Sequence, residues 1–213
     1  MIIILSVIGI LVICTATVVL TSLYGNNPTK GALIENYANP KAALLVIDVQ
    51  NDITGNTGQY GDTTDFVDRI NEAITFAEEN DMEILYIKNT FRNSLLLLLS
   101  GGRFREGTEG VELDSDLSIV NDNIFLKHIG DSFSSTDMEE YLISHSVDTL
   151  YLAGADAAAC VYSTARGAIN RGYNVNIIED AIITINEKTL AQMLDQYEKD
   201  GIKIIRNGSF DNT

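Results

Sequence analysis

The sequence predicts an α/β protein, a Rossmann-like three-layer α/β/α sandwich on a six-stranded, parallel, doubly wound sheet, preceded by an N-terminal transmembrane helix. Continuous apolar runs such as AALLVID at 42–48 are typical of strands that a parallel sheet buries on both faces. Stretches with apolar side chains at helical spacing separate these runs, as at 63–80. Because right-handed crossovers connect parallel strands, the helices are expected on both faces of the sheet.

The predicted elements alternate along the chain. The predicted strands are 42–48, 83–87, 124–127, 149–153, 175–178 and 202–205. The predicted helices are 63–80, 137–144, 159–172 and 187–199. Ligands of such sheets bind beyond the carboxyl ends of the strands. The residues that follow each strand are therefore the candidates for function.

The transmembrane helix is predicted from residues 1–23, an apolar run without charge, since the first ionisable side chain is Lys30. About 20 apolar residues suffice to cross a bilayer. A cleaved signal peptide would have a basic start and a shorter apolar run. A lipoprotein signal would have a small residue before Cys14, where this chain has Ile13. Residues 1–24 are therefore predicted as a transmembrane anchor or signal segment, with the membrane as a partner.

The rest of the chain divides into a linker and one domain. Residues 25–40 are rich in Asn, Gly and Pro, which is typical of linkers, and 41–213 form the predicted domain. Lys30 and Lys41 follow the apolar segment and no basic residue precedes it. This asymmetry favours a membrane-anchored, single-pass protein with its folded domain in the cytoplasm.

Composition excludes several classes of protein. With 14 Lys and Arg against 30 Asp and Glu, the net charge of -16 disfavours nucleic acid as a partner. The 46% of hydrophobic residues excludes a disordered chain. Cys14 and Cys160 are the two cysteines, so neither a disulfide framework nor a zinc site made of thiolates is available.

Three predicted strands are followed by chemically capable side chains. Asp48 ends the first strand, Lys127 ends the third, and Cys160 follows the fourth after a loop of small residues. Each has an ordinary structural interpretation: a turn residue, a surface lysine and a buried thiol. Together, a carboxylate, an ammonium group and a thiol at one edge of a sheet predict a catalytic site.

The sequence around these three residues resembles the isochorismatase-like cysteine hydrolase family over about residues 41–180. The matching stretches are 44–52, 107–110, 125–127, 131–136 and 153–161, followed by Thr164-Ala165, Gly172-Tyr173 and Asp180-Ala181. The family includes nicotinamidases, N-carbamoylsarcosine amidase and streptothricin hydrolase. The resemblance implies that the domain 41–213 is such a hydrolase and that Asp48, Lys127 and Cys160 are its catalytic residues.

The chemistry of the three groups agrees with this assignment. A free thiol has a pKa near 8.5 and needs a base, a cation or a helix N-terminus to become a nucleophile. Asp48 can take the proton, Lys127 favours ionised neighbours, and Cys160 lies in the first turn of the helix 159–172. We therefore expect a lowered pKa for Cys160, attack of its sulfur on a carbonyl, and hydrolysis of the resulting thioester.

The resemblance also implies an oxyanion hole made by the backbone N–H groups of Asp156 and Cys160, with a cis peptide bond between Ala155 and Asp156. Asp156 departs from the family, because many relatives have an apolar or small residue there. It either tunes the pocket or caps the helix.

A second departure concerns metals. Nicotinamidases bind a metal through an Asp and His cluster after the first strand, whereas 51–83 contains no His. We therefore predict no metal site and no cofactor. The two histidines, His128 and His145, are interpreted as structural.

The substrate is expected to be a small amide or ureido compound. Five residues in loops after the strands are predicted to line its pocket: Gln50, Tyr60, Phe91, Arg92 and Phe133. Arg92, Arg103 or Arg105 could hold a carboxylate, or be solvated loop residues.

The run Leu95 to Leu99 is a buried helix segment, an oligomer contact or a membrane-facing patch. We favour the oligomer contact, with a homodimer or homotetramer.

The predicted function is therefore hydrolysis of an amide, ureido or carbamoyl C–N bond through a covalent thioester. Two alternatives stay open: an isochorismatase-type vinyl-ether hydrolase, and a catalytically silent binding or scaffold protein on the same fold.

Overall fold

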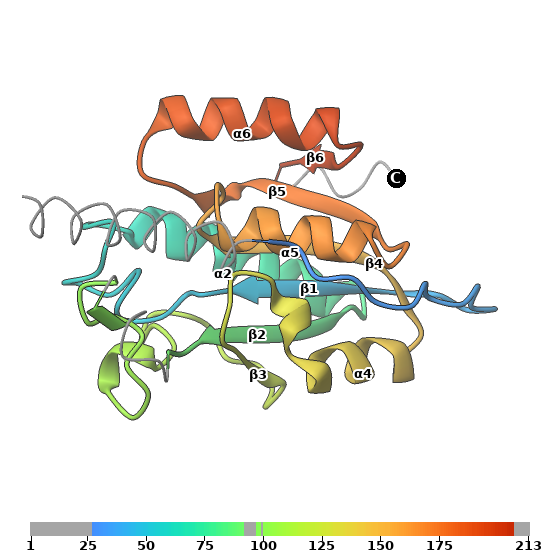
Figure 1. Ribbon diagram of the computed structural model, residues 1–213, viewed down its shortest axis with the longest axis horizontal. Coiled ribbons are helices and arrows are strands. Elements are labelled where there is room, and N and C mark those ends of the chain that lie inside the picture. The colour runs from blue at the N-terminus through green and yellow to red at the C-terminus, as the bar shows by residue number, and fades with distance from the viewer. Residues whose placement is uncertain (1–26, 92–96, 99, 207–213) are drawn as a thin grey trace, which may run out of the picture.

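The computed structural model describes residues 27–91, 97–98 and 100–206 and contains one six-stranded sheet (Figure 1). The strands are β1 (Lys41–Ile47), β2 (Glu83–Asn89), β3 (Ile124–Lys127), β4 (Val147–Ala155), β5 (Asn174–Ile183) and β6 (Lys203–Ile205). Their order is β3-β2-β1-β4-β5-β6, and each neighbouring pair is parallel. The predicted parallel, doubly wound sheet is therefore confirmed.

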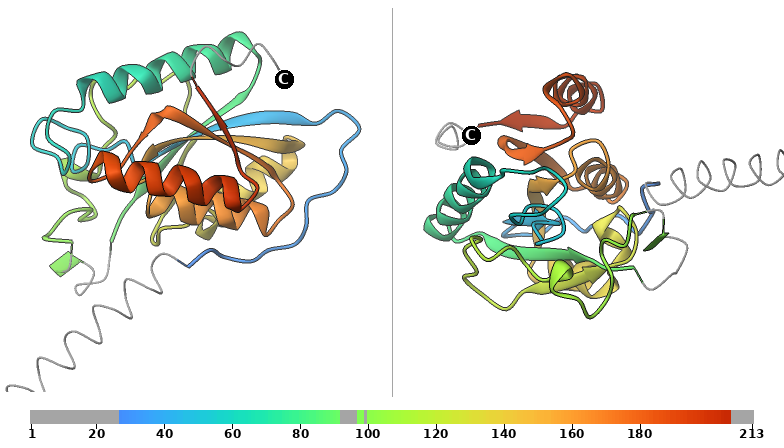
Figure 2. Two further views of the ribbon diagram at one scale, coloured as in Figure 1. Left: turned by 90° about the horizontal axis from the view of Figure 1, so that it is seen from above. Right: turned by 90° about the vertical axis from the view of Figure 1, so that its left-hand side faces the viewer.

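Helices cover both faces of the sheet, as Figure 2 shows. They are α2 (Thr64–Glu79), α4 (Thr136–Ser144), α5 (Cys160–Ile169) and α6 (Glu187–Lys199), with short 3-10 turns η1 (Glu109–Val111) and η2 (Ser132–Ser134). Successive residues of β1 point to opposite faces. Leu44 packs in the core with α2, whereas Leu45 packs in the core shared with α4, α5 and α6. Burial of the sheet on both faces explains the continuous apolar runs.

The order in which strands are added to the sheet changes direction between β1 and β4. β2 and β3 lie on one side of β1, and β4 lies on the other. The helices that follow these two neighbouring strands, α2 and α5, pack on opposite faces of the sheet, and sheets of this kind bind ligands at such a point. Gly154 of β4 has φ +125, and a Cβ there would overlap the carbonyl oxygen of Ile47. Glycine thus lets the end of β4 pass close to the end of β1.

The membrane part of the predicted fold class is wrong for the structure described. Among the described residues, none of the helices is long and apolar enough to span a bilayer. The longest, α2, has 16 residues, about 24 Å at 1.5 Å per residue, against a core of about 30 Å. Residues 1–24 lie outside the described residues. The transmembrane helix, the membrane as a partner and the single-pass location with a cytoplasmic domain are therefore not retained.

The described part of the predicted linker lies against the domain. Thr29 donates two hydrogen bonds to the buried carboxylate of Asp131, from its backbone N–H at 2.6 Å and its hydroxyl at 2.7 Å. The side chain of Asn170 donates to the carbonyl oxygen of Thr29 at 2.8 Å, and the N–H of Ile34 donates to the carbonyl oxygen of Arg171 at 2.9 Å. Residues 29–34 therefore contact the segment that follows α5.

The leucine run is described only in part. Leu98 is 76% exposed, whereas Leu95, Leu96 and Leu99 lie outside the described residues. Neither the oligomer contact nor the dimer or tetramer is tested, and both stay predictions.

Candidate active site

The structure brings Asp48, Lys127 and Cys160 together at the carboxyl edge of the sheet. Asp48 directly follows β1, Lys127 ends β3, and Cys160 is the first residue of α5. The side chain of Lys127 reaches past the end of β2 and places its Nζ 2.9 Å from Oδ2 of Asp48. Lys127 is 0% exposed and Asp48 2%, so this ion pair is buried. Lys127 Nζ also donates to the carbonyl oxygen of Gly130 at 2.9 Å.

The three side chains control one another's pKa values. Burial raises the pKa of Asp48, although the charge of Lys127 and hydrogen bonds from Lys127 and Cys160 oppose this. Burial lowers the pKa of Lys127, but the negative charges of Asp48 and Cys160 outweigh it, and the net shift is upward. The trio therefore holds an ionised Lys127 and one negative charge beside it.

Cys160 is a thiol when Asp48 is ionised. Burial, followed by the charge of Asp48, raises the pKa of Cys160 to about 12, although Lys127 lowers it. This differs from the sequence expectation of a lowered pKa. A helix N-terminus and a lysine do adjoin the sulfur, but desolvation and the like charge of Asp48 are larger effects. A proton can leave the thiol by passing to Asp48, whose carboxylate is near enough to raise the pKa of Cys160.

The loop before Cys160 is held by backbone bonds. The peptide bond between Ala155 and Asp156 is cis, as the family resemblance implies. The N–H of Ala157 donates to Ile183 O at 2.8 Å, and Tyr197 donates its hydroxyl to Ala157 O at 2.6 Å. Among the described residues, the N–H groups of Asp156 and Cys160 have no hydrogen-bond acceptor. The sequence analysis predicts these two N–H groups as the donors of an oxyanion hole.

Tyr60 and Asp156 contact each other beside the nucleophile. The Tyr60 hydroxyl donates to Asp156 Oδ2 at 2.5 Å, and Thr184 Oγ1 donates to the same carboxylate. Burial, followed by the hydrogen bond to Asp156, raises the pKa of Tyr60, and the nearby charge of Cys160 adds to the increase. Tyr60, predicted to line the pocket, therefore lies beside Cys160.

Gln50 has a different position from the one predicted. It is 0% exposed, and its Nε2 donates to the carbonyl oxygens of Asn89 and Val111 at 3.1 and 2.8 Å. Its Oε1 accepts from the N–H of Asn89 at 2.8 Å. Both amide hydrogens are thus used by the backbone. Gln50 links the loop after β1 to β2 and η1 and has no donor left for a substrate.

Phe133 and Phe91, two further predicted pocket residues, pack on other aromatic side chains. Phe133 is buried in the core, with its ring 5.5 Å from that of Tyr173 and the guanidinium of Arg171 over it at 4.6 Å. Phe91 packs edge to face on Phe104 at 5.3 Å. Arg92 lies outside the described residues.

The other arginines and the histidines also have described positions. Arg103 and Arg105 are exposed. Nδ1 of His128 is within hydrogen-bond distance of the backbone oxygen of Thr90, at 2.8 Å, and His145 stacks on Tyr141 at 3.9 Å. These contacts are structural.

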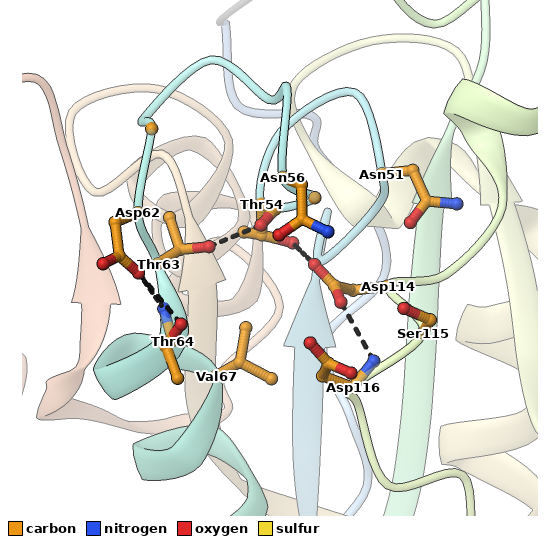
Figure 3. Close-up of a pocket in the computed structure, with 12 residues that line it drawn as sticks. Asn51, Thr54, Asn56, Asp62, Thr63, Thr64, Val67, Asp114, Ser115 and Asp116 are labelled. Atoms are coloured by element: carbon orange, nitrogen blue, oxygen red, sulfur yellow. Dashed lines mark hydrogen bonds between the residues drawn. The ribbon is translucent and has the colours of Figure 1, made fainter.

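A pocket of about 410 Å³ has a lining that includes none of Asp48, Lys127 and Cys160. Figure 3 shows the side chains around it. The pocket is lined by Asn51, Thr54, Gly55, Asn56, Gly61, Asp62, Thr63, Thr64, Val67, Asp114, Ser115 and Asp116. Its buried carboxylate, Asp114, accepts from the Thr54 hydroxyl at 2.6 Å and from the N–H of Asp116 at 3.0 Å. Asp114 therefore holds the loop that forms this part of the wall.

Three site residues escaped the sequence analysis. Asn89 ends β2 between β1 and β3, is buried, and its Oδ1 has no partner among the described residues. Its position after an apolar strand was the signal that could have found it. Thr184 directly follows β5, and Tyr197 lies in α6. No sequence pattern around either residue indicates that it contacts the loop before Cys160.

Among the described residues, no group of three His, Cys, Asp or Glu side chains is arranged to hold a metal ion. The absence of a catalytic metal remains a prediction.

Comparison with known proteins places this fold and site in context. The model of the isochorismatase domain matches residues 42–208. An uncharacterized isochorismatase family protein, YddQ, of Bacillus subtilis is 30% identical over 152 residues, which are 67% of this chain and 77% of that protein. N-carbamoylsarcosine amidase of an Arthrobacter species is 31% identical over 131 residues, 54% of this chain and 47% of that protein.

Solved structures resemble the chain over most of its length. N-carbamoylsarcosine amidase from Thermoplasma acidophilum has a TM-score of 0.71 at 22% identity, covering 81% of this chain and 99% of that one, which shows a shared fold. Nicotinamidase from Bacillus subtilis has a TM-score of 0.70 at 25% identity, covering 77% and 98%.

Proposed function

The chain belongs to the isochorismatase family of hydrolases, and on that premise we propose that it is a cysteine hydrolase with the triad Asp48, Lys127 and Cys160. Its substrate would be a small amide, ureido or carbamoyl compound, whose C–N bond it cleaves. Relatives and structural neighbours that are named as amidases support this class of bond.

One observation carries the proposal: a thiol at a helix N-terminus contacts a buried carboxylate that is itself paired with a buried lysine. Burying three ionisable groups together costs free energy, and a binding scaffold has no physical need for them. A nucleophile, a base and a cation in mutual contact are what covalent hydrolysis requires.

In the first half of the reaction, Cys160 Sγ attacks the substrate carbonyl carbon while its proton passes to Asp48. The carbonyl oxygen becomes an oxyanion. When the tetrahedral intermediate collapses, the C–N bond breaks, the nitrogen takes the proton from Asp48, and ammonia or an amine leaves. The raised pKa of Cys160 makes this coupled transfer necessary, because little free thiolate exists near neutral pH.

In the second half, water attacks the thioester and gives a proton to Asp48. The C–S bond breaks, the acid or carbamate leaves, and the proton returns to the Cys160 sulfur. Asp48 thus acts as base and acid in each half.

Two further groups assist. The free N–H groups of Asp156 and Cys160 are proposed to donate to the oxyanion. Lys127 keeps a positive charge beside the carboxylate and thiol, so that a negative charge is stabilised whichever of them carries it.

The test is Cys160→Ala, assayed for ammonia release from primary amides, ureas and N-carbamoyl acids. We expect loss of hydrolysis by about 10³-fold or more, because the residual rate comes from binding alone. Intact mass of the parent should reveal an acyl adduct. Hydrolysis that is undiminished in Cys160→Ala would contradict the covalent mechanism, and release of a keto acid from a vinyl ether by that variant would favour the isochorismatase-type reaction.

A further inference from the structure

We infer that Tyr60 and Thr184 are positioning residues that fix the Asp156 side chain and thereby aim its backbone N–H at the oxyanion. The inference rests on the proposed function and deepens it, because it identifies what holds one half of the oxyanion hole in place.

The contacts of Asp156 carry this inference. Oδ2 accepts from the Tyr60 hydroxyl at 2.5 Å and from Thr184 Oγ1 at 2.9 Å. Oδ1 accepts from the N–H of Ala158 at 2.5 Å and from Thr184 Oγ1 at 3.0 Å. Its carbonyl oxygen accepts from the N–H groups of Ala159 and Val161 at 3.0 and 3.1 Å. Among the described residues, every polar atom of Asp156 therefore has a partner except its N–H.

The composition of the loop explains why an aspartate is needed. Ala155, Ala157, Ala158 and Ala159 surround Asp156, so no other side chain between Gly154 and Cys160 can make a hydrogen bond. A donor that stabilises a transition state must be held in place before the reaction, since reorganisation would cancel the gain. Asp156 is the one residue between Gly154 and Cys160 whose own side chain anchors this loop.

The two hydroxyls come from separate parts of the fold. Tyr60 lies in the loop after β1, and Thr184 directly follows β5. Their hydroxyls therefore join the Asp156 side chain to two other segments of the chain. Thr184 is buried, and the raised pKa of Tyr60 keeps its hydroxyl protonated as a donor.

The carboxylate is not a ligand group for substrate. A carboxylate has about four lone-pair sites, and three donors use most of them: the Tyr60 hydroxyl, the N–H of Ala158, and the Thr184 hydroxyl, whose single hydrogen is shared between the two oxygens. The same donors disperse its negative charge, which reduces its repulsion of a nearby oxyanion.

The test uses an aldehyde, which adds to a thiol to form a hemithioacetal: an S–C bond forms and the thiol proton moves to the former carbonyl oxygen. Acetaldehyde and benzaldehyde would be measured as reversible protectors of Cys160 against iodoacetamide. A Cys14→Ser background leaves one cysteine to react. Alkylation by iodoacetamide needs no oxyanion hole, whereas the adduct places its oxygen there.

The variants are Tyr60→Phe and Thr184→Val, with Thr184→Ser as the conservative rescue. Tyr86→Phe is the matched control, because its hydroxyl bonds to Ser118 O and the N–H of Val120, in the loop that precedes β3. We expect Tyr60→Phe and Thr184→Val to weaken aldehyde protection about tenfold and to lower kcat more than KM. Alkylation without aldehyde should stay within about threefold of the parent. Thr184→Ser and Tyr86→Phe should behave as the parent does.

Each other outcome is distinct. If the parent is protected and both variants are protected equally well, the positioning role is wrong while the proposed function stands. If aldehyde protection and alkylation fall together, the hydroxyls merely maintain structure and the inference is overturned. If the parent forms no aldehyde adduct and hydrolyses no amide, the proposed function fails and the inference falls with it.

Discussion

Nζ of Lys127 lies 2.9 Å from Oδ2 of Asp48, although the strands that carry the two residues are separated by β2. Both side chains are buried. The lysine therefore crosses the end of a neighbouring strand to neutralise a carboxylate that adjoins a thiol. The same contact affects both the stability of the fold and the chemistry of the site, because burying either charge without the other costs a large free energy of folding.

Replacing Lys127 tests how much the ion pair with Asp48 contributes to the free energy of unfolding. Lys127→Met leaves the Asp48 carboxylate buried without its cation, and we expect a loss of about 3–5 kcal/mol of unfolding free energy at pH 7. Asp48→Asn combined with Lys127→Met should recover much of it, which urea unfolding of both variants would measure.

The same variant predicts a pH dependence of stability. Burial raises the pKa of Asp48 and Lys127 opposes this, so in Lys127→Met the folded-state pKa rises further above the unfolded value. A raised pKa of an acid in the folded state favours folding at low pH and disfavours it as pH rises. The loss should therefore be smaller near pH 5 than at pH 7. An equal or larger loss at the lower pH would contradict this assignment of charges.

Thr29 is predicted to stabilise the domain from outside the sheet. Its hydroxyl donates to buried Asp131 and accepts from Arg171 Nη1 at 3.0 Å. Thr29→Val removes both bonds at nearly constant volume, and we expect a loss of about 1–2 kcal/mol in urea unfolding. Thr75→Val is the control, since its hydroxyl bonds to Asn71 O on the exposed side of α2. Equal losses in the two variants would show that the bonds of the Thr29 hydroxyl add no more stability than an exposed hydroxyl on a helix.

Metal removal is predicted to leave hydrolysis unchanged. Residues 51–83 contain no His, and the described residues include no cluster of three metal-ligating side chains. Activity before and after dialysis against a chelator, with elemental analysis of the protein, would measure this. Loss of activity that zinc or iron restores would show that the site recruits a metal through ligands not identified here.

The sheet was predictable because burial on both faces imposes continuous apolar runs. The bounds of the strands were less predictable. β5 continues through Glu179 and Asp180, where its register with β4 shifts, and pairs with β4 again at Ile182 and Ile183. Residues 29–34 have a linker composition, yet long-range bonds to Asp131 and Asn170 hold them, and composition carries no such information.

Some features of the site could also be predicted from the sequence, and others could not. The positions of Asp48, Lys127 and Cys160 at the ends of strands made them candidates, and the resemblance of the surrounding motifs to the family implied their roles. The direction of the Cys160 pKa shift could not be predicted from the sequence. It depends on desolvation and on the distance to Asp48 rather than on the kinds of neighbours. The contact of Tyr60 and Thr184 with Asp156 joins residues 96 and 28 positions away, which a single sequence does not encode locally.

The central claim is that Asp48 is the base that receives the Cys160 proton. The most direct measurement is the pH dependence of Cys160 alkylation by iodoacetamide in the parent and in Asp48→Asn, both in the Cys14→Ser background, with amide hydrolysis measured beside it. Asp48 raises the pKa of Cys160, so its removal leaves Lys127 to pair with the thiolate.

We predict that Asp48→Asn shifts the alkylation profile to lower pH and speeds alkylation at neutral pH by about tenfold or more, while hydrolysis falls by about 10²-fold or more. Faster alkylation of Cys160 together with slower hydrolysis is expected when the base that receives the thiol proton is removed. An alkylation profile that is unchanged or shifted to higher pH, or hydrolysis that survives the substitution, would contradict the account.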